Sequence, residues 1–184
     1  MRRFEAIKRI MEVVTDEIVV CNLGHPSQEL YMNKDRPENF YMLGSMGLAS
    51  SIGLGIAMSQ ERRVVVIDGD GAVMMNLSTF ASIGVVRPKN YILAIIDNGA
   101  YGSTGFQETF SAKGIDLARI AESCNIETVT VFEEDRIKER LETMLKGEGP
   151  YCLLIKVKKG MPDNLNIIPY DSTAIRDRFT GSIR

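Results

Sequence analysis

The sequence lacks tryptophan and contains a single histidine, His25. A catalytic centre built from several histidines, such as that of a multi-histidine zinc hydrolase, is therefore excluded. Cysteine is also scarce, since Cys21, Cys124 and Cys152 lie far apart and form no C-x-x-C pair. An odd and scattered set argues against a disulfide framework, a zinc site or an iron–sulfur cluster, and it favours a reducing cytoplasm.

Neither sign of charge predominates, because 22 Lys and Arg residues are balanced by 24 Asp and Glu residues. Without a basic field we expect neither nucleic acid nor an anionic membrane as a partner. No apolar run approaches the roughly 18 residues of a membrane span, and the N-terminal residues show no secretory signal. The 184 residues, 45% of them hydrophobic, fit one globular domain over 1–184 in the cytoplasm.

Short β-branched runs alternate with longer segments of helical period. Strands are predicted at 18–21, 64–67, 91–96, 128–132 and 151–157. Helices are predicted at 3–14, 45–59, 76–85, 116–122 and 133–146, with a further short helix from Asp171 in a polar C-terminal tail, 160–184. Continuous Val/Ile/Leu strands separated by helices indicate an α/β fold, doubly wound, whose mostly parallel sheet carries helices on both faces.

The predicted helix over 45–59 contains three glycines, Gly47, Gly53 and Gly55. Each of them costs about 1 kcal/mol relative to alanine in a helix interior. Close approach of another backbone or of a ligand would explain why they are there. We therefore expect this helix to be tightly packed and buried.

Unusual polar and glycine-rich segments follow three of the predicted strands, namely 22–27, 68–71 and 97–105. In parallel sheets, ligands bind beyond the carboxyl ends of the strands. The 99–115 connection is also long for a compact domain, which favours a binding loop or lid. On that loop, Ser103, Thr104 and Gln107 could bind a sulfonate or carboxylate by hydrogen bonds, or be solvated loop residues.

Gly69-Asp70-Gly71 leaves one predicted strand, and Asn98 ends the next. The glycines let the backbone approach a bulky anion, and their N–H groups can point at phosphate oxygens. Asp70 itself would repel a phosphate, so it is better suited to ligate a divalent cation between carboxylate and phosphate, as Mg²⁺ is commonly bound. The amide oxygen of Asn98 would lie beside the same ion. The two motifs together predict a diphosphate–metal site, although each alone could be a tight turn.

These residues carry a resemblance to a known family. Gly-Asp-Gly followed by a strand that ends in Asn resembles the signature of thiamine diphosphate (ThDP) enzymes, in their diphosphate-binding module. Gly44-Ser45-Met46-Gly47 is similar to the segment of the decarboxylase branch that meets the aminopyrimidine of the cofactor. The likeness is greatest to the sulfopyruvate and phosphonopyruvate decarboxylases, and it covers most of the chain. Because 184 residues correspond to one module only, the chain resembles the β subunit of a two-chain enzyme.

The resemblance implies a role for each matching residue. Asp70, Asn98 and the backbone carbonyl of Ala100 would hold Mg²⁺. The cofactor-binding residues would be Gly44, Ser45, Met46, Gly69, Asp70, Gly71, Ala72, Asn98, Ala100 and Tyr101. Among them, the amides of Gly71 and Ala72 would contact the diphosphate and the carbonyl of Gly44 the 4′-amino group. Met46 would be the apolar wedge that keeps the cofactor in a V shape, a task that suits an unbranched, polarizable side chain.

The implied reaction is decarboxylation of 3-sulfopyruvate to sulfoacetaldehyde and CO₂, in coenzyme M biosynthesis. The cofactor accepts the electrons left when CO₂ departs, so a protein with one histidine can perform it. The resemblance places the required glutamate on a separate pyrimidine-binding module, which implies a hetero-oligomer with an α subunit. His25 is the candidate catalytic residue, for contact with diphosphate or substrate or for proton transfer, or else a loop histidine bonded to backbone.

Three alternatives remain at this point. A phosphonopyruvate decarboxylase subunit would differ mainly in how the 3-anion is recognised. A 2-oxoacid:ferredoxin oxidoreductase β subunit is less favoured because cysteines for an iron–sulfur cluster are missing. A non-catalytic diphosphate- or nucleotide-binding module could use the same fold, but no G-x-G-x-x-G fingerprint follows the first predicted strand.

Overall fold

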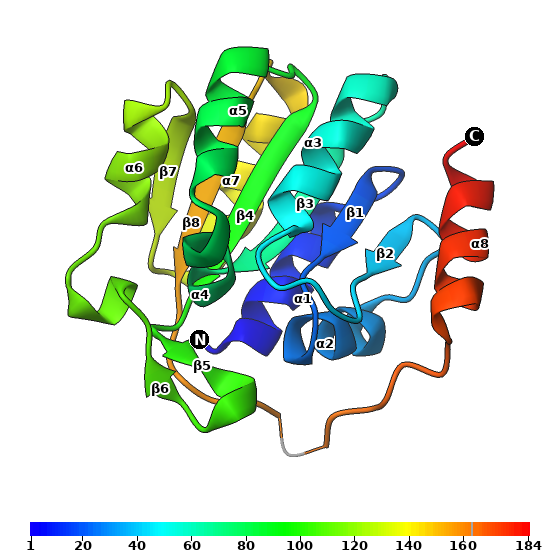
Figure 1. Ribbon diagram of the computed structural model, residues 1–184, viewed down its shortest axis with the longest axis horizontal. Coiled ribbons are helices and arrows are strands. Elements are labelled where there is room, and N and C mark those ends of the chain that lie inside the picture. The colour runs from blue at the N-terminus through cyan, green and yellow to red at the C-terminus, as the bar shows by residue number, and fades with distance from the viewer. Residues whose placement is uncertain (163) are drawn as a thin grey trace.

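A single parallel sheet organises the protein, as the computed structural model in Figure 1 shows for residues 1–162 and 164–184. The strands lie in the order β2-β1-β3-β4-β8-β7, and every pairing is parallel. Their bounds are β1 (Ile18–Cys21), β2 (Asn39–Tyr41), β3 (Val64–Gly69), β4 (Tyr91–Asp97), β7 (Glu127–Val131) and β8 (Tyr151–Lys156). A small antiparallel hairpin, β5 (Ala100–Tyr101) with β6 (Gln107–Glu108), follows β4. The predicted fold class is confirmed.

Helices cover both faces of this sheet (Figure 1). One layer comprises α1 (Arg3–Val13), α2 (His25–Asn33) and α7 (Glu134–Lys146), and the other comprises α3 (Ala49–Ser59), α5 (Ser78–Val86) and α6 (Leu117–Ser123). Shorter helical segments are α4 (Asp70–Val73), η1 (Met74–Asn76), η2 (Gly102–Thr104) and η3 (Ser111–Lys113), and α8 (Ser172–Ser182) lies beside the β2 edge. Among the described residues, no helix is both long and apolar enough to cross a membrane.

The continuous apolar strands are explained by two hydrophobic cores, one on each face of the sheet. On β3, Val65 and Ile67 belong to the core under α1 and α7, whereas Val64 and Val66 belong to the core under α3 and α5. All four are fully buried. Burying such a side chain contributes roughly 1.5–3 kcal/mol, so the central strands hold the carboxyl-end loops on a rigid frame.

The connection expected over 99–115 contains the β5–β6 hairpin and the short helical segments η2 and η3. Three further segments also differ from the sequence prediction. The helix expected over 45–59 begins only at Ala49, because Ser45 (φ 60°) and Gly47 (φ 91°) adopt left-handed conformations that no helix continues. The segment expected to be a loop over 22–27 already enters α2 at His25, with proline in the first turn. The edge strand β2 has three residues and was not predicted, because so short a segment shows no apolar run.

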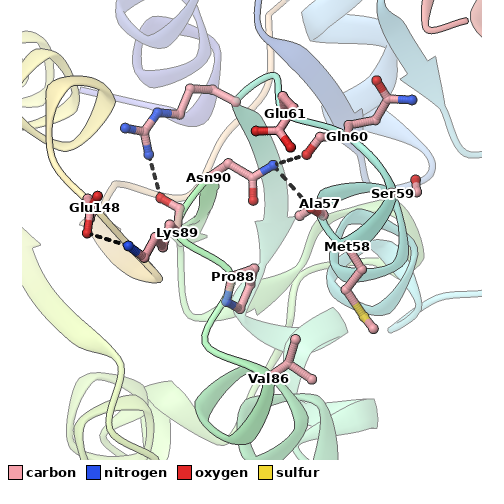
Figure 2. Close-up of a pocket in the computed structure, with 11 residues that line it drawn as sticks. Ala57, Met58, Ser59, Gln60, Glu61, Val86, Pro88, Lys89, Asn90 and Glu148 are labelled. Atoms are coloured by element: carbon pink, nitrogen blue, oxygen red, sulfur yellow. Dashed lines mark hydrogen bonds and ion pairs between the residues drawn. The ribbon is translucent and has the colours of Figure 1, made fainter.

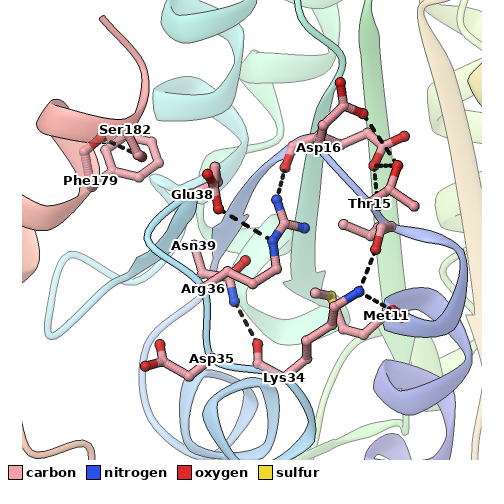
Figure 3. A network of polar contacts seen from close by, with 12 residues as sticks. Met11, Thr15, Asp16, Lys34, Asp35, Arg36, Glu38, Asn39, Phe179 and Ser182 are labelled. Atoms are coloured by element: carbon pink, nitrogen blue, oxygen red, sulfur yellow. Dashed lines mark hydrogen bonds and ion pairs between the residues drawn. The ribbon is translucent and has the colours of Figure 1, made fainter.

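A polar network fixes β2 and the end of α1 (Figure 3). Lys34 Nζ donates hydrogen bonds to the carbonyls of Met11 (3.2 Å) and Val14 (2.7 Å), which end α1. Arg36 Nη2 donates to the carbonyl of Glu17 (2.6 Å). The two Lys34 contacts satisfy backbone acceptors that the end of α1 would otherwise leave unpaired.

The C-terminal tail packs on the same edge rather than extending away from it. Phe179 on α8 contacts Phe40 on β2, with ring centroids 5.1 Å apart. Arg178 pairs with Asp35 (3.0 Å) and lies over the Tyr170 ring (4.1 Å to the centroid). The helix predicted from Asp171 is present, and Asp171 caps it by accepting a hydrogen bond from the amide of Ala174.

The two glycines inside α3 lie in opposite environments, which gives a matched test of the fold. A Cβ added at Gly53 would lie 2.2 Å from Val66 Cγ2 on β3, whereas one added at Gly55 would meet nothing within 4 Å. We expect Gly53→Ala to lower the free energy of unfolding by about 1–3 kcal/mol through overpacking. Gly55→Ala should raise it by up to about 1 kcal/mol. Urea denaturation of both variants would measure this; a stabilised Gly53→Ala would contradict the packing described.

Candidate functional site

A cavity of about 170 Å³ lies where the carboxyl ends of the central strands meet the β5–β6 hairpin. Eight of the predicted site residues line it: Met46, Gly69, Asp70, Gly71, Ala72, Asn98, Ala100 and Tyr101. Gly44 and Ser45 are exposed and lie outside the lining, as does His25. The structure therefore brings the Gly-Asp-Gly motif and Asn98 together at the ends of β3 and β4, as the motif spacing predicted. The roles of these residues in binding a cofactor or a metal stay predictions.

Asp70 is the acidic group of this cavity. It opens α4, is 2% exposed, and its Oδ2 accepts hydrogen bonds from Ser111 Oγ (2.8 Å) and from Thr109 Oγ1. Burial raises the pKa of Asp70, and the nearby charge of Asp97 adds to this, against the hydrogen bonds from the two hydroxyls. A divalent cation at this carboxylate would offset the cost of holding it ionised.

Asn98 follows β4 and is 9% exposed. Its Oδ1 accepts a hydrogen bond from the amide of Ala100 (3.0 Å), which fixes the side chain in a turn over the end of the strand. The neighbouring Asp97 has other partners. Its Oδ1 accepts hydrogen bonds from the Gly99 amide (3.0 Å) and Ser111 Oγ (2.8 Å), and its carboxylate forms an ion pair with Lys156.

The donor set fits Mg²⁺ better than a transition metal. Among the described residues, no group of three or more His, Cys, Asp or Glu side chains could hold a metal ion. Mg²⁺ does not need such a cluster, because it is commonly bound by one or two carboxylates together with substrate phosphates and water. Asp70 with the neutral oxygens of Asn98 and Ala100 would supply that set.

The two glycines of the Gly-Asp-Gly motif have different surroundings. A Cβ at Gly69 would have Asn22 Nδ2 as its nearest neighbour at 3.9 Å, so the backbone there stays open to a ligand. A Cβ at Gly71 would lie 2.4 Å from Tyr101 Cε1. Gly71 is therefore required for the packing of the Tyr101 ring, a close approach within the protein that the motif alone did not reveal.

The turn that carries Met46 packs against α4. Asn76 Nδ2 donates a hydrogen bond to the Gly47 carbonyl (3.1 Å), and a Cβ at Gly47 would lie 3.0 Å from the Ala72 carbonyl oxygen. The left-handed turn in front of α3 thus holds the half-buried Met46 at the cavity. This is the physical reason why the residues before 49 are not helical.

His25 begins α2, after Gly24 at φ 77°. Its Nδ1 is buried and has no hydrogen-bond partner among the described residues. Burial lowers the pKa of His25, and the positive charge of Arg3 lowers it further, so the neutral imidazole is favoured at neutral pH. A neutral ring can accept or donate one proton, so it is chemically suited to the predicted role in proton transfer.

Several residues of the site were not found from the sequence. Arg3 lines the cavity from α1, and Asn22 lines it from the end of β1. A signal for Arg3 was available, because it shares one helical face with the buried Ile7 and Ile10, where an unpaired arginine is rarely tolerated. Thr109 and Ser111 on the long loop gave no signal of their contact with Asp70.

Asp68, at the end of β3, makes stability depend on pH. It is 1% exposed; its Oδ1 accepts the Gly69 amide hydrogen bond (2.8 Å), but its Oδ2 has no hydrogen-bond partner among the described residues. Burial raises the pKa of Asp68 to about 7. The unfolded carboxyl titrates near about 3.9, so the folded state binds the proton more tightly. Stability from this group is therefore greatest at low pH and is lost as pH rises towards the folded pKa.

We expect the melting temperature of Asp68→Asn, relative to the wild type, to rise as pH increases from about 5 to about 8. The neutral amide carries no ionisation cost, so only the wild type loses stability over this interval. Thermal unfolding of the cofactor-free chain at several pH values measures the difference. A difference that stays constant with pH would show that Asp68 is not buried in this way.

A second, larger hollow of about 710 Å³ lies at the amino ends of β3 and β4 (Figure 2). Several of its polar groups contact one another or nearby carbonyls: Lys89 pairs with Glu148 (3.0 Å), and Asn90 Nδ2 donates to the carbonyls of Ala57 (3.1 Å) and Gln60 (2.7 Å). These contacts tie together the loops at the amino ends of the strands. The opposite, carboxyl end holds the predicted site residues.

Comparisons with known proteins show which family the chain resembles. Residues 24–155 match the family described as thiamine pyrophosphate enzyme, C-terminal TPP binding domain. Sulfopyruvate decarboxylase subunit beta of Methanocaldococcus jannaschii is 50% identical, with 100% of this chain and 97% of that protein covered. The protein of the same name from Methanococcus maripaludis is 46% identical, covering 100% and 98%.

More distant similarity extends to larger proteins. Phosphonopyruvate decarboxylase of Streptomyces viridochromogenes is 38% identical over 96% of this chain, but only 45% of that protein is covered. A solved structure, the thiamine diphosphate-dependent 4-hydroxybenzoylformate decarboxylase of Rhodococcus jostii RHA1, superposes with a TM-score of 0.73 at 16% identity. It covers 89% of this chain and 33% of that one, and it supports the fold alone.

Proposed function

Because the chain belongs to the thiamine pyrophosphate enzyme family, as its C-terminal cofactor-binding domain, we propose that it is a subunit of a decarboxylase converting 3-sulfopyruvate to sulfoacetaldehyde and CO₂. The observation that carries this proposal is the convergence of Gly69, Asp70, Ala72 and Asn98 on one cavity. Full-length similarity to sulfopyruvate decarboxylase β subunits supports the substrate. The family resemblance implies that the reaction would belong to coenzyme M biosynthesis, and the few scattered cysteines favour the cytoplasm as its place.

Different residues of the cavity would bind the metal ion and the diphosphate. Asp70 would hold Mg²⁺ together with Asn98 and the carbonyl of Ala100, and the amides of Gly71 and Ala72 would meet the diphosphate. Thiamine diphosphate, when bound, supplies the electron sink for the departing CO₂. The protein contributes orientation and exclusion of water, through the apolar Met46 and the Tyr101 ring that covers Gly71.

A partner subunit is part of this proposal. The chain corresponds to 45% of the phosphonopyruvate decarboxylase that it resembles, so that protein has a further part of comparable length outside the matched region. Here an α subunit would supply it, with the pyrimidine-binding surface and its carboxylic acid. The site would then form across the interface between the two chains.

The test of the substrate is a side-by-side comparison in the assembled enzyme. The chain is co-expressed with the candidate α subunit, loaded with ThDP and Mg²⁺, and CO₂ release is measured on sulfopyruvate, phosphonopyruvate and pyruvate. We expect the highest kcat/KM on sulfopyruvate. A higher kcat/KM on phosphonopyruvate would assign the enzyme to that reaction, and adenine nucleotide binding without ThDP binding would indicate a non-catalytic module.

A further inference from the structure

Arg3 is a buried cation whose charge the proposed reaction does not yet use. It is 7% exposed, and it pairs with the fully buried Glu29 through Nε (2.7 Å) and Nη2 (2.8 Å). This two-point contact fixes the plane of the guanidinium. Nη1 has no hydrogen-bond partner among the described residues.

The remaining edge of Arg3 lies at the cavity. Arg3 is one of the lining residues, and a Cβ added at Gly102 would lie 3.7 Å from Arg3 Nη1 and 3.7 Å from His25 Nδ1. Arg3 Nη1 and His25 Nδ1, which have no hydrogen-bond partner among the described residues, therefore both approach Gly102. The next two residues, Ser103 and Thr104, also line the cavity. A small anion would find a fixed guanidinium edge and hydroxyl donors there.

We propose that Nη1 of Arg3 binds the anionic 3-substituent of the 2-oxo acid, and that Arg3 is thereby the specificity-determining residue of the substrate pocket. The proposal rests on the proposed function, because it takes the substrate class from it. Glu29 holds the guanidinium in place and balances its charge while the pocket is empty. The sulfonate oxygens would accept hydrogen bonds from Nη1.

The chemistry of decarboxylation favours the 3-substituent over the carboxylate as the ligand. The carboxylate leaves as neutral CO₂, so a fixed cation on it would stabilise the substrate more than the transition state and slow the reaction. The sulfonate keeps its charge throughout. A buried cation can therefore hold it without opposing the reaction.

The position of Arg3 also favours the substrate, rather than the cofactor diphosphate, as the anion that it binds. The carboxylate and amide that would hold Mg²⁺, Asp70 and Asn98, lie at the ends of β3 and β4, where the ion itself neutralises a diphosphate. Arg3 instead reaches the cavity at Gly102, one residue beyond the Tyr101 ring that covers Gly71. Binding of the substrate anion and binding of the cofactor diphosphate predict different effects of an Arg3 substitution, and the experiment distinguishes them.

The experiment uses the assembled enzyme with Arg3→Gln and with Arg3→Lys. A lysine keeps a cation against Glu29, but its single ammonium cannot both form that pair and reach the cavity. For each variant, we expect kcat/KM on sulfopyruvate to fall by about 10- to 100-fold, the effect of losing one charged hydrogen bond. On pyruvate, which lacks the 3-anion, it should change by less than about threefold.

Calorimetry gives a readout that does not depend on turnover. Binding of 3-sulfopropionate to the loaded complex should weaken by a similar factor, while the affinity for ThDP and Mg²⁺ stays at the wild-type value. Arg9→Gln serves as the control, because Arg9 lies on the same helix but pairs with Glu134 (2.7 Å) away from the cavity. This variant should match the wild type in every assay.

Equal losses on sulfopyruvate and pyruvate would overturn the proposal and show a structural role for the Arg3–Glu29 pair. A parallel loss of ThDP affinity would overturn it as well and assign the cation to the cofactor. If the wild type released no CO₂ from sulfopyruvate, the proposed function would fail. In that case unchanged 3-sulfopropionate binding in the variants would separately overturn the role of Arg3, and weakened binding would support it.

Discussion

Replacing Asp70 by alanine should abolish ThDP binding and turnover in the assembled enzyme. Asp70 is the one carboxylate among the described residues that line the cavity, so its loss leaves Mg²⁺ with neutral protein ligands. Mutation of residues that merely support a metal ligand costs about 10- to 100-fold in affinity or activity. We therefore expect losses beyond that range for the ligand itself, measured by calorimetry with ThDP and Mg²⁺ and by CO₂ release.

Misfolding can be separated from loss of the metal. Burial raises the pKa of Asp70, so the ionised carboxylate opposes folding when no cation is bound. Asp70→Asn, without cofactor, should melt no lower than the wild type, and yet should not bind ThDP. Asp177→Asn, at an exposed position on α8, is the control and should retain full affinity. An Asp70→Ala enzyme with wild-type cofactor affinity would refute the proposed metal site.

The second large effect is the dependence on a partner. Purified alone with saturating ThDP and Mg²⁺, the chain should release no measurable CO₂. Activation of the cofactor pyrimidine requires a carboxylic acid beside it, as the family resemblance implies, and in the proposed site Asp70 would serve the metal instead. The described lining of the cavity holds no further carboxyl group. In the proposed function, the α subunit would supply this group.

A titration measures this dependence. Increasing amounts of the α subunit, added to a fixed amount of this chain, should raise the rate until the two are present in a fixed ratio, and the rate should then stay constant. The α subunit alone is the control and should also be inactive. Robust decarboxylation by either isolated chain would mean that the site is not shared.

The central fold was predictable because burial on both faces leaves a strong pattern. Strands such as Tyr91–Asp97 and Tyr151–Lys156 are apolar at nearly every position, which only a strand between two layers of helices requires. The edge strand Asn39–Tyr41 lacked such a pattern. α2 was missed because Gly24 and Pro26 are typical of a turn, although proline is equally suited to the first turn of a helix.

The site was predictable where backbone chemistry requires particular residues. Gly-Asp-Gly and the Asn at the next strand end lie together because parallel neighbours β3 and β4 bring their carboxyl ends to one edge. Arg3 and Ser111 were not predictable in the same way. Arg3 lines the cavity from α1, and Ser111 contacts Asp70 from the long loop. Both are distant in sequence from the Gly-Asp-Gly motif, so the tertiary packing brings them to the site.

The most direct measurement is a crystal structure of the two-chain complex with ThDP and Mn²⁺ in place of Mg²⁺, in which anomalous scattering locates the ion. We predict one ion bound by Asp70, by the amide oxygen of Asn98 and by the carbonyl of Ala100, at about 2.0–2.3 Å, with the diphosphate on Gly71 and Ala72. An ion bound elsewhere, or a diphosphate held away from the ends of β3 and β4, would contradict the account.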